Sequence, residues 1–328
     1  MTLKKKSLQM EMTFEDKFNE CIATFENQSS PEYAKHERYL YADFVELVTI
    51  FSTNREVSLG DIQDRFFGTK EYNSAPERDT DETLLIEIFI LLQERSVLYG
   101  DSYPFSFDNE NTRLVINNVM TDNHKFYIYL LISSKLNIFK SFKTELTDEF
   151  ESICKDALSR YLPNVAVVKN FGRNSAYTGN AKTKIRKLAD DLNLTVDEYE
   201  LNQVSERNNQ ERGLDIVGWI PFEDKCMNLL VFLAQCACGK DFESKQHDTR
   251  RFKNYLNFYK SDPIHIMFIP YSLINARERK FYQSDLIEDD YLIFERKRIV
   301  DLYDTVRFNT LKSFNVVESC IGYRESVV

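Results

Sequence analysis

Hydrophobic positions in the first 140 residues recur mainly at helical spacing. Apolar side chains return every three or four residues between Tyr39 and Phe51 and again along residues 81–97, which predicts two amphipathic helices. Residues 124–139 are apolar nearly all round, a pattern typical of a helix buried between two domains. A short alternating segment at Leu114 and Ile116 indicates a strand. Short helices with a small β element resemble a winged-helix arrangement.

The pattern changes after residues 140–146 to short apolar runs that alternate with helical segments. The expected order is helix (147–161), strand (165–171), long insert, two strands (214–220 and 228–237), basic helix (247–259) and strand (264–269), with two helices after residue 286. Such alternation predicts an α/β (α+β) fold with a mixed sheet flanked by helices. We therefore expect a mainly helical N-terminal domain, 1–141, and an α/β domain, 142–328.

Composition narrows the class of protein. A chain of 328 residues with 9 Gly and 7 Pro fits two folded domains better than a linker-rich or disordered protein. No run approaches the ~20 apolar residues of a membrane span, and no apolar segment follows the basic N-terminus as in a secretory signal. We therefore expect a cytoplasmic protein whose six cysteines are free thiols and not a zinc site.

Net charge argues against a simple nucleic-acid binder. The chain carries −10 at neutral pH, whereas DNA affinity comes largely from Lys and Arg that neutralise phosphates. Basic residues do cluster in the C-terminal part, at 182–187, 249–253, 277–280 and 295–298. Each run alone is typical of a solvated helix face, but together they can form a local DNA-binding surface.

Two polar residues interrupt the most apolar strands. Asp215 lies in LDIVGW and Gln235 lies at the end of LLVFLAQ. A buried lone carboxylate is costly unless it is paired or binds a metal, and carboxylate and amide oxygens suit a hard cation such as Mg²⁺. Metal-assisted phosphodiester hydrolysis needs such oxygens together with a lysine. The alternatives are that Asp215 caps a turn near Gly213 and that the Gln235 amide satisfies a sheet edge.

The motifs from residue 142 to residue 300 resemble a known family. In order they are FE-x-IC-x-x-AL-x-x-YL from Phe150, V-x-NFG from Val168, RGLDIVGWIPF from Arg212, LLVFLAQCACGKDF-x-x-K from Leu229, and IFERKRIVDL from Ile293. Their order and spacing resemble the PD-(D/E)XK restriction-endonuclease-like core. They are specifically similar to bacterial defence-type nucleases in which Gln replaces the acidic residue of the E-x-K half-motif.

The resemblance implies an Mg²⁺ (or Mn²⁺) site. Asp215 and Gln235 would be metal ligands, supported by the backbone carbonyl of Cys236, and Glu151 would complete the site through water. A solvated carboxylate on a helix face is the alternative for Glu151. The implied activity is hydrolysis of DNA phosphodiester bonds in defence against phage, with a partner protein of the same defence system; a homo-oligomer stays open.

The catalytic lysine departs from the family pattern. A strict E-x-K would place lysine at position 237, where this chain has Ala237. Lys240, just past the strand, and Lys245, one to two turns further, are the candidates to replace it, with Lys240 slightly preferred. This departure supports a second hypothesis, a catalytically degenerate nuclease fold that serves as a DNA-binding or scaffold subunit.

Two further hypotheses use other features of the chain. Cys236 and Cys238 flank the expected metal position, with His247 the nearest histidine along the chain, so thiol catalysis is an alternative enzyme class. Small buried packing residues are the simpler interpretation of both cysteines. The apolar N-terminal helices are the support for a purely structural interaction protein.

Overall fold

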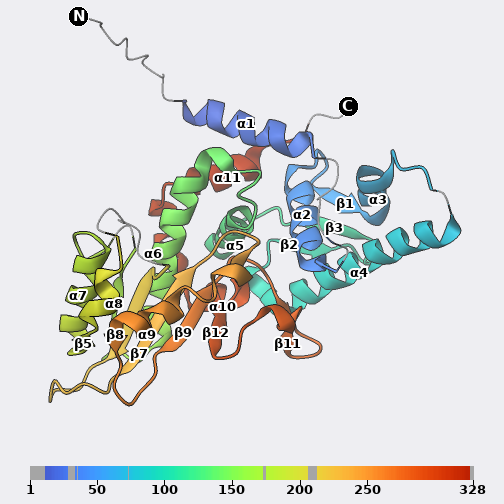
Figure 1. Ribbon diagram of the computed structural model, residues 1–328. Helices are drawn as coiled ribbons and strands as arrows, with labels where there is room; N and C mark the ends of the chain where they lie inside the picture. Colours follow the sequence, from blue (N-terminus) through green and yellow to red (C-terminus); the bar gives the residue numbers. More distant parts are fainter. Residues whose placement is uncertain are drawn as a thin grey trace, which may run out of the picture.

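The computed structural model describes residues 12–28, 34, 36–72, 74–172, 175–205 and 213–325. Its N-terminal region is mainly helical and carries a small antiparallel sheet of strand order β1-β3-β2 (Figure 1). The elements are α1 (Phe14–Glu26), α2 (Arg38–Phe51), β1 (Glu56–Ser58), α3 (Leu59–Phe67), α4 (Ala75–Tyr99), β2 (Phe105–Phe107), β3 (Arg113–Ile116) and α5 (Asp122–Ser133). This confirms the helical N-terminal region and the short β element.

The C-terminal half is built around a five-stranded mixed sheet of order β12-β9-β7-β6-β4. Strands β4, β6 and β7 are antiparallel neighbours, whereas β7, β9 and β12 run parallel. The elements are the turn η2 (Lys140–Phe142), α6 (Lys143–Tyr161), β4 (Val167–Asn170), α7 (Ala181–Leu192), β5 (Thr195–Val196), α8 (Glu198–Asn202), β6 (Ile216–Ile220), β7 (Leu230–Cys236), the turns η3 (Phe242–Lys245) and η4 (Thr249–Arg251), α9 (Phe252–Tyr255), β8 (Leu256–Asn257), β9 (Ile264–Phe268), β10 (Ile274–Asn275), β11 (Lys280–Phe281), β12 (Tyr291–Phe294), α10 (Arg296–Leu302) and α11 (Phe314–Gly322).

The mixed α/β architecture agrees with the sequence pattern, but three boundaries differ. Helix α6 starts at Lys143, so Thr147 lies inside it and its hydroxyl donates to the Lys143 carbonyl instead of capping the helix. Residues 291–294, expected in a helix, form β12 because they pair with β9, and α10 begins only after the Glu295 cap. The expected helix 247–259 is two short turns, a four-residue helix and β8.

Helix α5 is central, as its all-round apolar pattern predicted. Its side chains are buried from Phe126 to Ser133, and one hydrophobic cluster extends from α1 through α5 to α11. A second cluster lies beneath α7 and α9, on the other face of the sheet. None of the described helices combines the length and apolar composition that a membrane crossing requires.

A buried charge network ties α2 to α4 and α10. The Asp43 carboxylate accepts from both ends of the Arg296 guanidinium at 3.1 and 2.9 Å, and it lies 2.8 Å from Arg95. Glu46 accepts from Arg95 at 2.8 Å and from Tyr103 and Tyr127 at 2.9 Å. These charged side chains are at most 1% exposed. The network therefore joins the N-terminal helices to the helix that follows β12.

Glu295, the cap of α10, makes the stability of the fold depend on pH. Burial raises its pKa from 4.5 to about 7, although its carboxylate accepts from the backbone N–H groups of Leu273 and Arg298. The folded state therefore holds a proton that the unfolded state releases above pH 4.5. The contribution of Glu295 to the free energy of unfolding is therefore highest below pH 4.5. It falls by up to about 3 kcal/mol as the pH rises through 7.

We expect Glu295→Gln to remove this fall, because an amide at position 295 does not titrate. Urea unfolding of both proteins between pH 5 and 8 measures the effect. The slope of unfolding free energy against pH, and not its absolute value, is the test, since the amide also loses one of the two backbone hydrogen bonds. Equal slopes in both proteins would contradict the assignment.

Candidate metal-dependent active site

One cavity of about 620 Å³ is lined by residues of helix α6 and of the adjoining ends of strands β6 and β7. All four expected metal-site residues line it: Asp215 directly before β6, Gln235 and Cys236 at the end of β7, and Glu151 in the middle of α6. The other lining residues are Leu136, Asn137, Lys140, Lys143, Thr147, Phe150, Cys238, Gly239 and Lys245. The structure therefore brings together residues that are far apart in the sequence, from Leu136 to Lys245.

Asp215 and Gln235 are held by the pairing of β6 with β7. The register pairs Ile216 with Ala234, so Asp215 lies opposite Gln235 on the same face of the sheet. The Asp215 N–H donates to the Ala234 carbonyl at 3.0 Å, and the Cys236 N–H donates to Asp215 Oδ2 at 2.7 Å. The carboxylate is thereby fixed at the end of the strand.

Glu151 approaches Asp215 across Gly172, which follows β4. A Cβ atom at Gly172 would lie 3.2 Å from Glu151 Oε2 and 3.4 Å from Asp215 Oδ1. The absence of a side chain there leaves room for the two carboxylates beside the same backbone segment. The Gly172 N–H also donates to the Asp215 carbonyl at 3.1 Å. Two carboxylates so placed are a suitable donor pair for a divalent cation.

Asp248 orients the Gln235 amide, and sequence reasoning missed it. Gln235 Nε2 donates to Asp248 Oδ2 at 3.2 Å. Because a carboxylate oxygen only accepts, the amide nitrogen faces Asp248 and the amide oxygen faces the other way. That oxygen, Gln235 Oε1, is buried and has no hydrogen-bond partner among the described residues. A buried amide oxygen without a hydrogen-bond partner, in a cavity that also contains carboxylates, is suited to bind a cation.

Gly213 is the one sequence signal that could have pointed to Asp248. Its φ is +81°, and a Cβ there would lie 2.3 Å from the Asp248 Cβ. Glycine is therefore needed for the chain entering β6 to pass close to Asp248. No spacing in the sequence links position 248 to position 235.

An amide suits position 235 better than a carboxylate because it can donate to Asp248. We expect Gln235→Glu to weaken metal binding about 10-fold or more, because two carboxylates about 3 Å apart repel and one takes up a proton. Adding Asp248→Asn places an amide donor beside the glutamate at position 235. We therefore expect the double variant to recover metal binding. Calorimetric titration with Mn²⁺ measures both. A single variant that binds as wild type, or a double variant worse than the single, would contradict the pairing.

The structure separates the two candidate lysines. Lys245 lines the cavity with the carboxylates, whereas Lys240 lines a neighbouring cavity and is absent from this one. Lys140 and Lys143, which precede and begin α6, also line the carboxylate cavity. Ala237 is fully buried in the core, so its position offers no lysine to the site. The slight preference for Lys240 is therefore not supported by the geometry.

The cysteines near the site are packing residues rather than nucleophiles. Burial raises the pKa of the Cys236 and Cys238 thiols well above the usual value, and that of Cys154 as well. A nucleophilic cysteine needs the opposite shift. His247 is exposed and lies 3.8 Å from Glu288, and within the described residues no hydrogen bond joins it to a thiol.

The basic runs do not converge on the cavity. Among the described residues, none from 182–187, 249–253, 277–280 or 295–298 lines it. Three of their arginines pair with acidic residues that do not line the cavity: Arg186 with Glu198, Arg251 with Asp248, and Arg296 with Asp43. Lys140, Lys143 and Lys245 provide the positive charge at the site instead.

The donor set has two carboxylates and one amide. Within the described residues, no three His, Cys, Asp or Glu side chains come together as a metal-binding group. A site made from Asp215, Glu151 and Gln235 contains only two residues of those types, so the amide oxygen is essential to it. Oxygen donors of this kind suit Mg²⁺ or Mn²⁺ better than Zn²⁺. No family model, curated protein or solved structure matches this chain.

Proposed function

We propose that the protein is a metal-dependent nuclease that hydrolyses DNA phosphodiester bonds. The observation that carries the proposal is the single cavity in which Asp215, Glu151 and Gln235 lie with three lysines. Carboxylate and amide oxygens together with ammonium groups suit a divalent cation and the phosphate that it would bind. Locally gathered lysines also offset the net charge of −10.

Asp215, Gln235 and Glu151 would hold the cation. A divalent cation held by these residues would supply Lewis-acid chemistry for phosphodiester hydrolysis. The Asp215 carboxylate is kept in position by the Cys236 N–H, and the Gln235 amide is kept in position by Asp248. The Lys245 ammonium orients the attacking water or neutralises charge that develops on the phosphate. Lys140 and Lys143 bind neighbouring phosphates.

The order of elements supports a restriction-endonuclease-like core for this domain. Helix α6 precedes the antiparallel strands β4, β6 and β7, and β9 returns parallel to β7 after the short turns and α9. The proposed ligands lie on the adjacent strands β6 and β7, as the sequence resemblance implies. The same resemblance supports a role in bacterial antiviral defence together with a partner protein.

Lys245 and Lys240 should respond differently to removal. We expect Lys245→Ala to lower the rate of plasmid cleavage about 100-fold. A positioned side chain that assists proton transfer in the reaction typically contributes about 10²–10⁴-fold to the rate. Lys240→Ala, one cavity away, should lower it less than about 10-fold. Initial rates of supercoiled-plasmid nicking compare the two variants. The reverse ranking would move the catalytic role to Lys240.

A second candidate function is a non-cleaving DNA-binding or scaffold subunit. Ala237, buried where the family pattern has lysine, is the observation that favours it. One experiment separates the candidates: supercoiled plasmid is incubated with the purified chain in Mg²⁺, in Mn²⁺ and in EDTA. Nicking in metal but not in EDTA supports the nuclease. DNA binding without nicking under all three conditions favours the scaffold, and neither binding nor nicking rejects both.

A further inference from the structure

A second cavity adjoins the carboxylate cavity. It has a volume of about 340 Å³, within the usual size range for a small-ligand site. Leu136, Asn137, Cys238 and Gly239 line both cavities, so the two share a wall made by the segment after α5 and the segment after β7. A polymer bound beside Asp215 and Glu151 could therefore extend into the second cavity.

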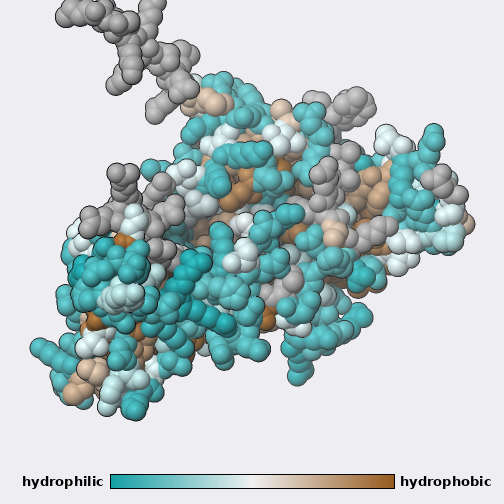
Figure 2. Space-filling view, in the orientation of Figure 1, coloured by the Kyte–Doolittle hydropathy of each residue, from teal (hydrophilic) through white to brown (hydrophobic). Residues whose placement is uncertain are grey.

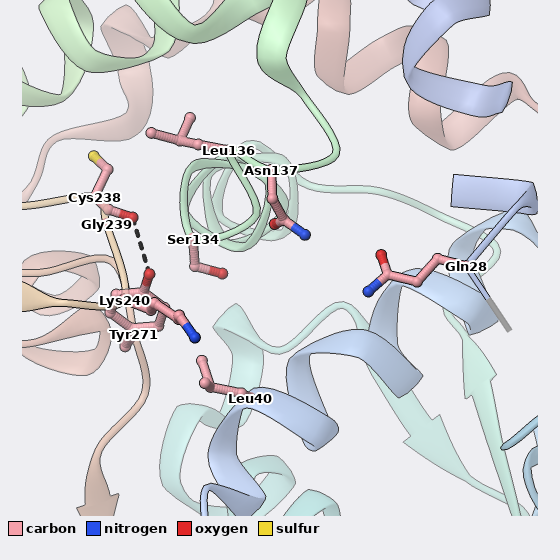
Figure 3. A pocket seen from close by; sticks show the side chains of 9 residues that line it. All are labelled: Gln28, Leu40, Ser134, Leu136, Asn137, Cys238, Gly239, Lys240 and Tyr271. Carbon is pink, nitrogen blue, oxygen red and sulfur yellow. Dashed lines mark hydrogen bonds between the residues drawn. The ribbon is translucent and has the colours of Figure 1, made fainter. Parts of the chain in front are cut away.

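The second cavity is lined by hydrogen-bonding groups that the fold does not use. The side chains of Gln28, Asn137 and Lys240 point into it from three separate segments (Figure 3). None of their side-chain nitrogens or oxygens has a hydrogen-bond partner in the part of the chain that the structure describes. Leu40 and Leu136 supply apolar walls.

The floor of this cavity is rigid. The Tyr271 hydroxyl donates to the Cys238 carbonyl at 2.9 Å, and the Tyr271 ring packs against Tyr39 and Phe242. Both Tyr271 and Cys238 are buried. A ligand in this cavity would contact the Gln28 and Asn137 amides and the Lys240 ammonium group. The rest of its contacts would be with aromatic and aliphatic side chains.

We propose that this cavity receives one unpaired nucleotide next to the phosphate that is cut. The inference rests on the proposed nuclease function and adds a base-recognition subsite to it. Gln28 and Asn137 contact the base edge, and Lys240 contacts a flanking phosphate. The path from the carboxylates to the subsite passes Gly239.

The chemistry favours a base over a simple anion. Asn and Gln amides carry one acceptor and two donor hydrogens, which is the combination that reads a base edge in pairs of hydrogen bonds. An anion site would need several cations, and Lys240 is the one cation in the described lining. The apolar walls suit the faces of a base. A nucleotide in this cavity has left a double-helical stack, so unpaired strands should bind best.

A substitution at Gly239 can block the path between the two cavities without altering a polar side chain. It is exposed, and a Cβ built on it meets nothing within 4 Å. Gly239→Ala should therefore be neutral, whereas Gly239→Trp projects a large side chain into the shared space. Gly239 lines both cavities but is not a proposed metal ligand, so both variants keep the Asp215, Gln235 and Glu151 side chains.

The test is fluorescence anisotropy of labelled single-stranded 15-mers of dA, dC, dG and dT, with EDTA present to prevent cleavage. We expect wild type and Gly239→Ala to bind alike and Gly239→Trp to bind about 10-fold more weakly, the order of effect of one bidentate amide–base pair. Gln28→Ala and Asn137→Ala should reduce the differences in affinity among the four oligonucleotides. Asn137 is exposed and Gln28 is half-buried, and thermal unfolding checks that every variant folds.

Two results overturn the inference, and they are distinguishable from failure of the nuclease proposal. If wild type binds the oligonucleotides or nicks plasmid in Mg²⁺ but Gly239→Trp binds as wild type, the subsite is wrong and the nuclease stands. If the amide variants keep the wild-type base preference, the subsite is likewise wrong. If wild type neither binds nor nicks, both proposals fall.

Discussion

We expect Asp215→Ala to lower the proposed metal-dependent nicking of supercoiled plasmid by at least about 100-fold. Asp215 is the proposed ligand on β6, and its carboxylate shares the cavity with Glu151 and Gln235. Losing a residue that only supports a metal ligand commonly costs 10–100-fold, so losing a ligand should cost at least the upper end of that range. Initial nicking rates in saturating Mg²⁺ measure the effect.

Asp215 also has a structural role, which the control must separate. Asp215 Oδ2 accepts from the Cys236 N–H, so Asp215→Ala leaves a buried donor unsatisfied. Asp215→Asn keeps an oxygen at that position and removes the charge. We expect it to unfold near the wild-type temperature and still to lose nicking. Asp262→Ala, at an 81% exposed position, is the matched control and should be fully active. Wild-type nicking by Asp215→Asn would reject the site.

We expect removal of the Asp43 carboxylate to destabilise the fold by about 3–5 kcal/mol. Asp43 is fully buried and contacts two buried guanidinium groups, Arg95 at 2.8 Å and Arg296 at 2.9 Å. Those two arginines hold the pKa of Asp43 down to about 2 against its burial, so the carboxylate is charged. Asp43→Ala would leave both arginines with only Glu46 as an acidic partner, and breaking a buried pair on one side is costly.

Urea unfolding measures this loss against an exposed pair. Arg113 and Glu56 form an ion pair with side chains 52% and 32% exposed, so Arg113→Ala should cost less than about 1 kcal/mol. Asp43→Ala should shift the unfolding midpoint far more. Similar shifts in the two variants would show that the buried network does not stabilise the junction between α2, α4 and α10.

The positions of strands β6 and β7, and the polar residues at their ends, were predictable from the sequence. Asp215 and Gln235 are polar residues in otherwise apolar strands, and such residues need a partner when buried. The pairing of β6 with β7 then places the two side chains opposite each other. The mixed sheet and the helical N-terminal region follow from the same alternation of patterns.

Other residues of the site come from tertiary packing and left no pattern in the sequence. Asp248 reaches Gln235 from the turns after β7, and Lys140 and Lys143 reach the cavity from the start of α6. The choice between Lys240 and Lys245 depends on how the η3 turn is placed, which apolar spacing does not encode. The apolar side chains of residues 291–294 continue directly into α10, so the sequence pattern predicts a helix there. Pairing with β9 makes these residues a strand instead.

Direct measurement of metal binding tests the central claim, that Asp215, Gln235 and Glu151 form a divalent-cation site. Mn²⁺ is titrated into the wild-type chain and into Asp215→Asn, and free Mn²⁺ is followed by electron paramagnetic resonance. The predicted result is saturable binding to the wild type that weakens at least about 100-fold in the variant. Equal Mn²⁺ binding by the two proteins, or none by the wild type, would contradict it.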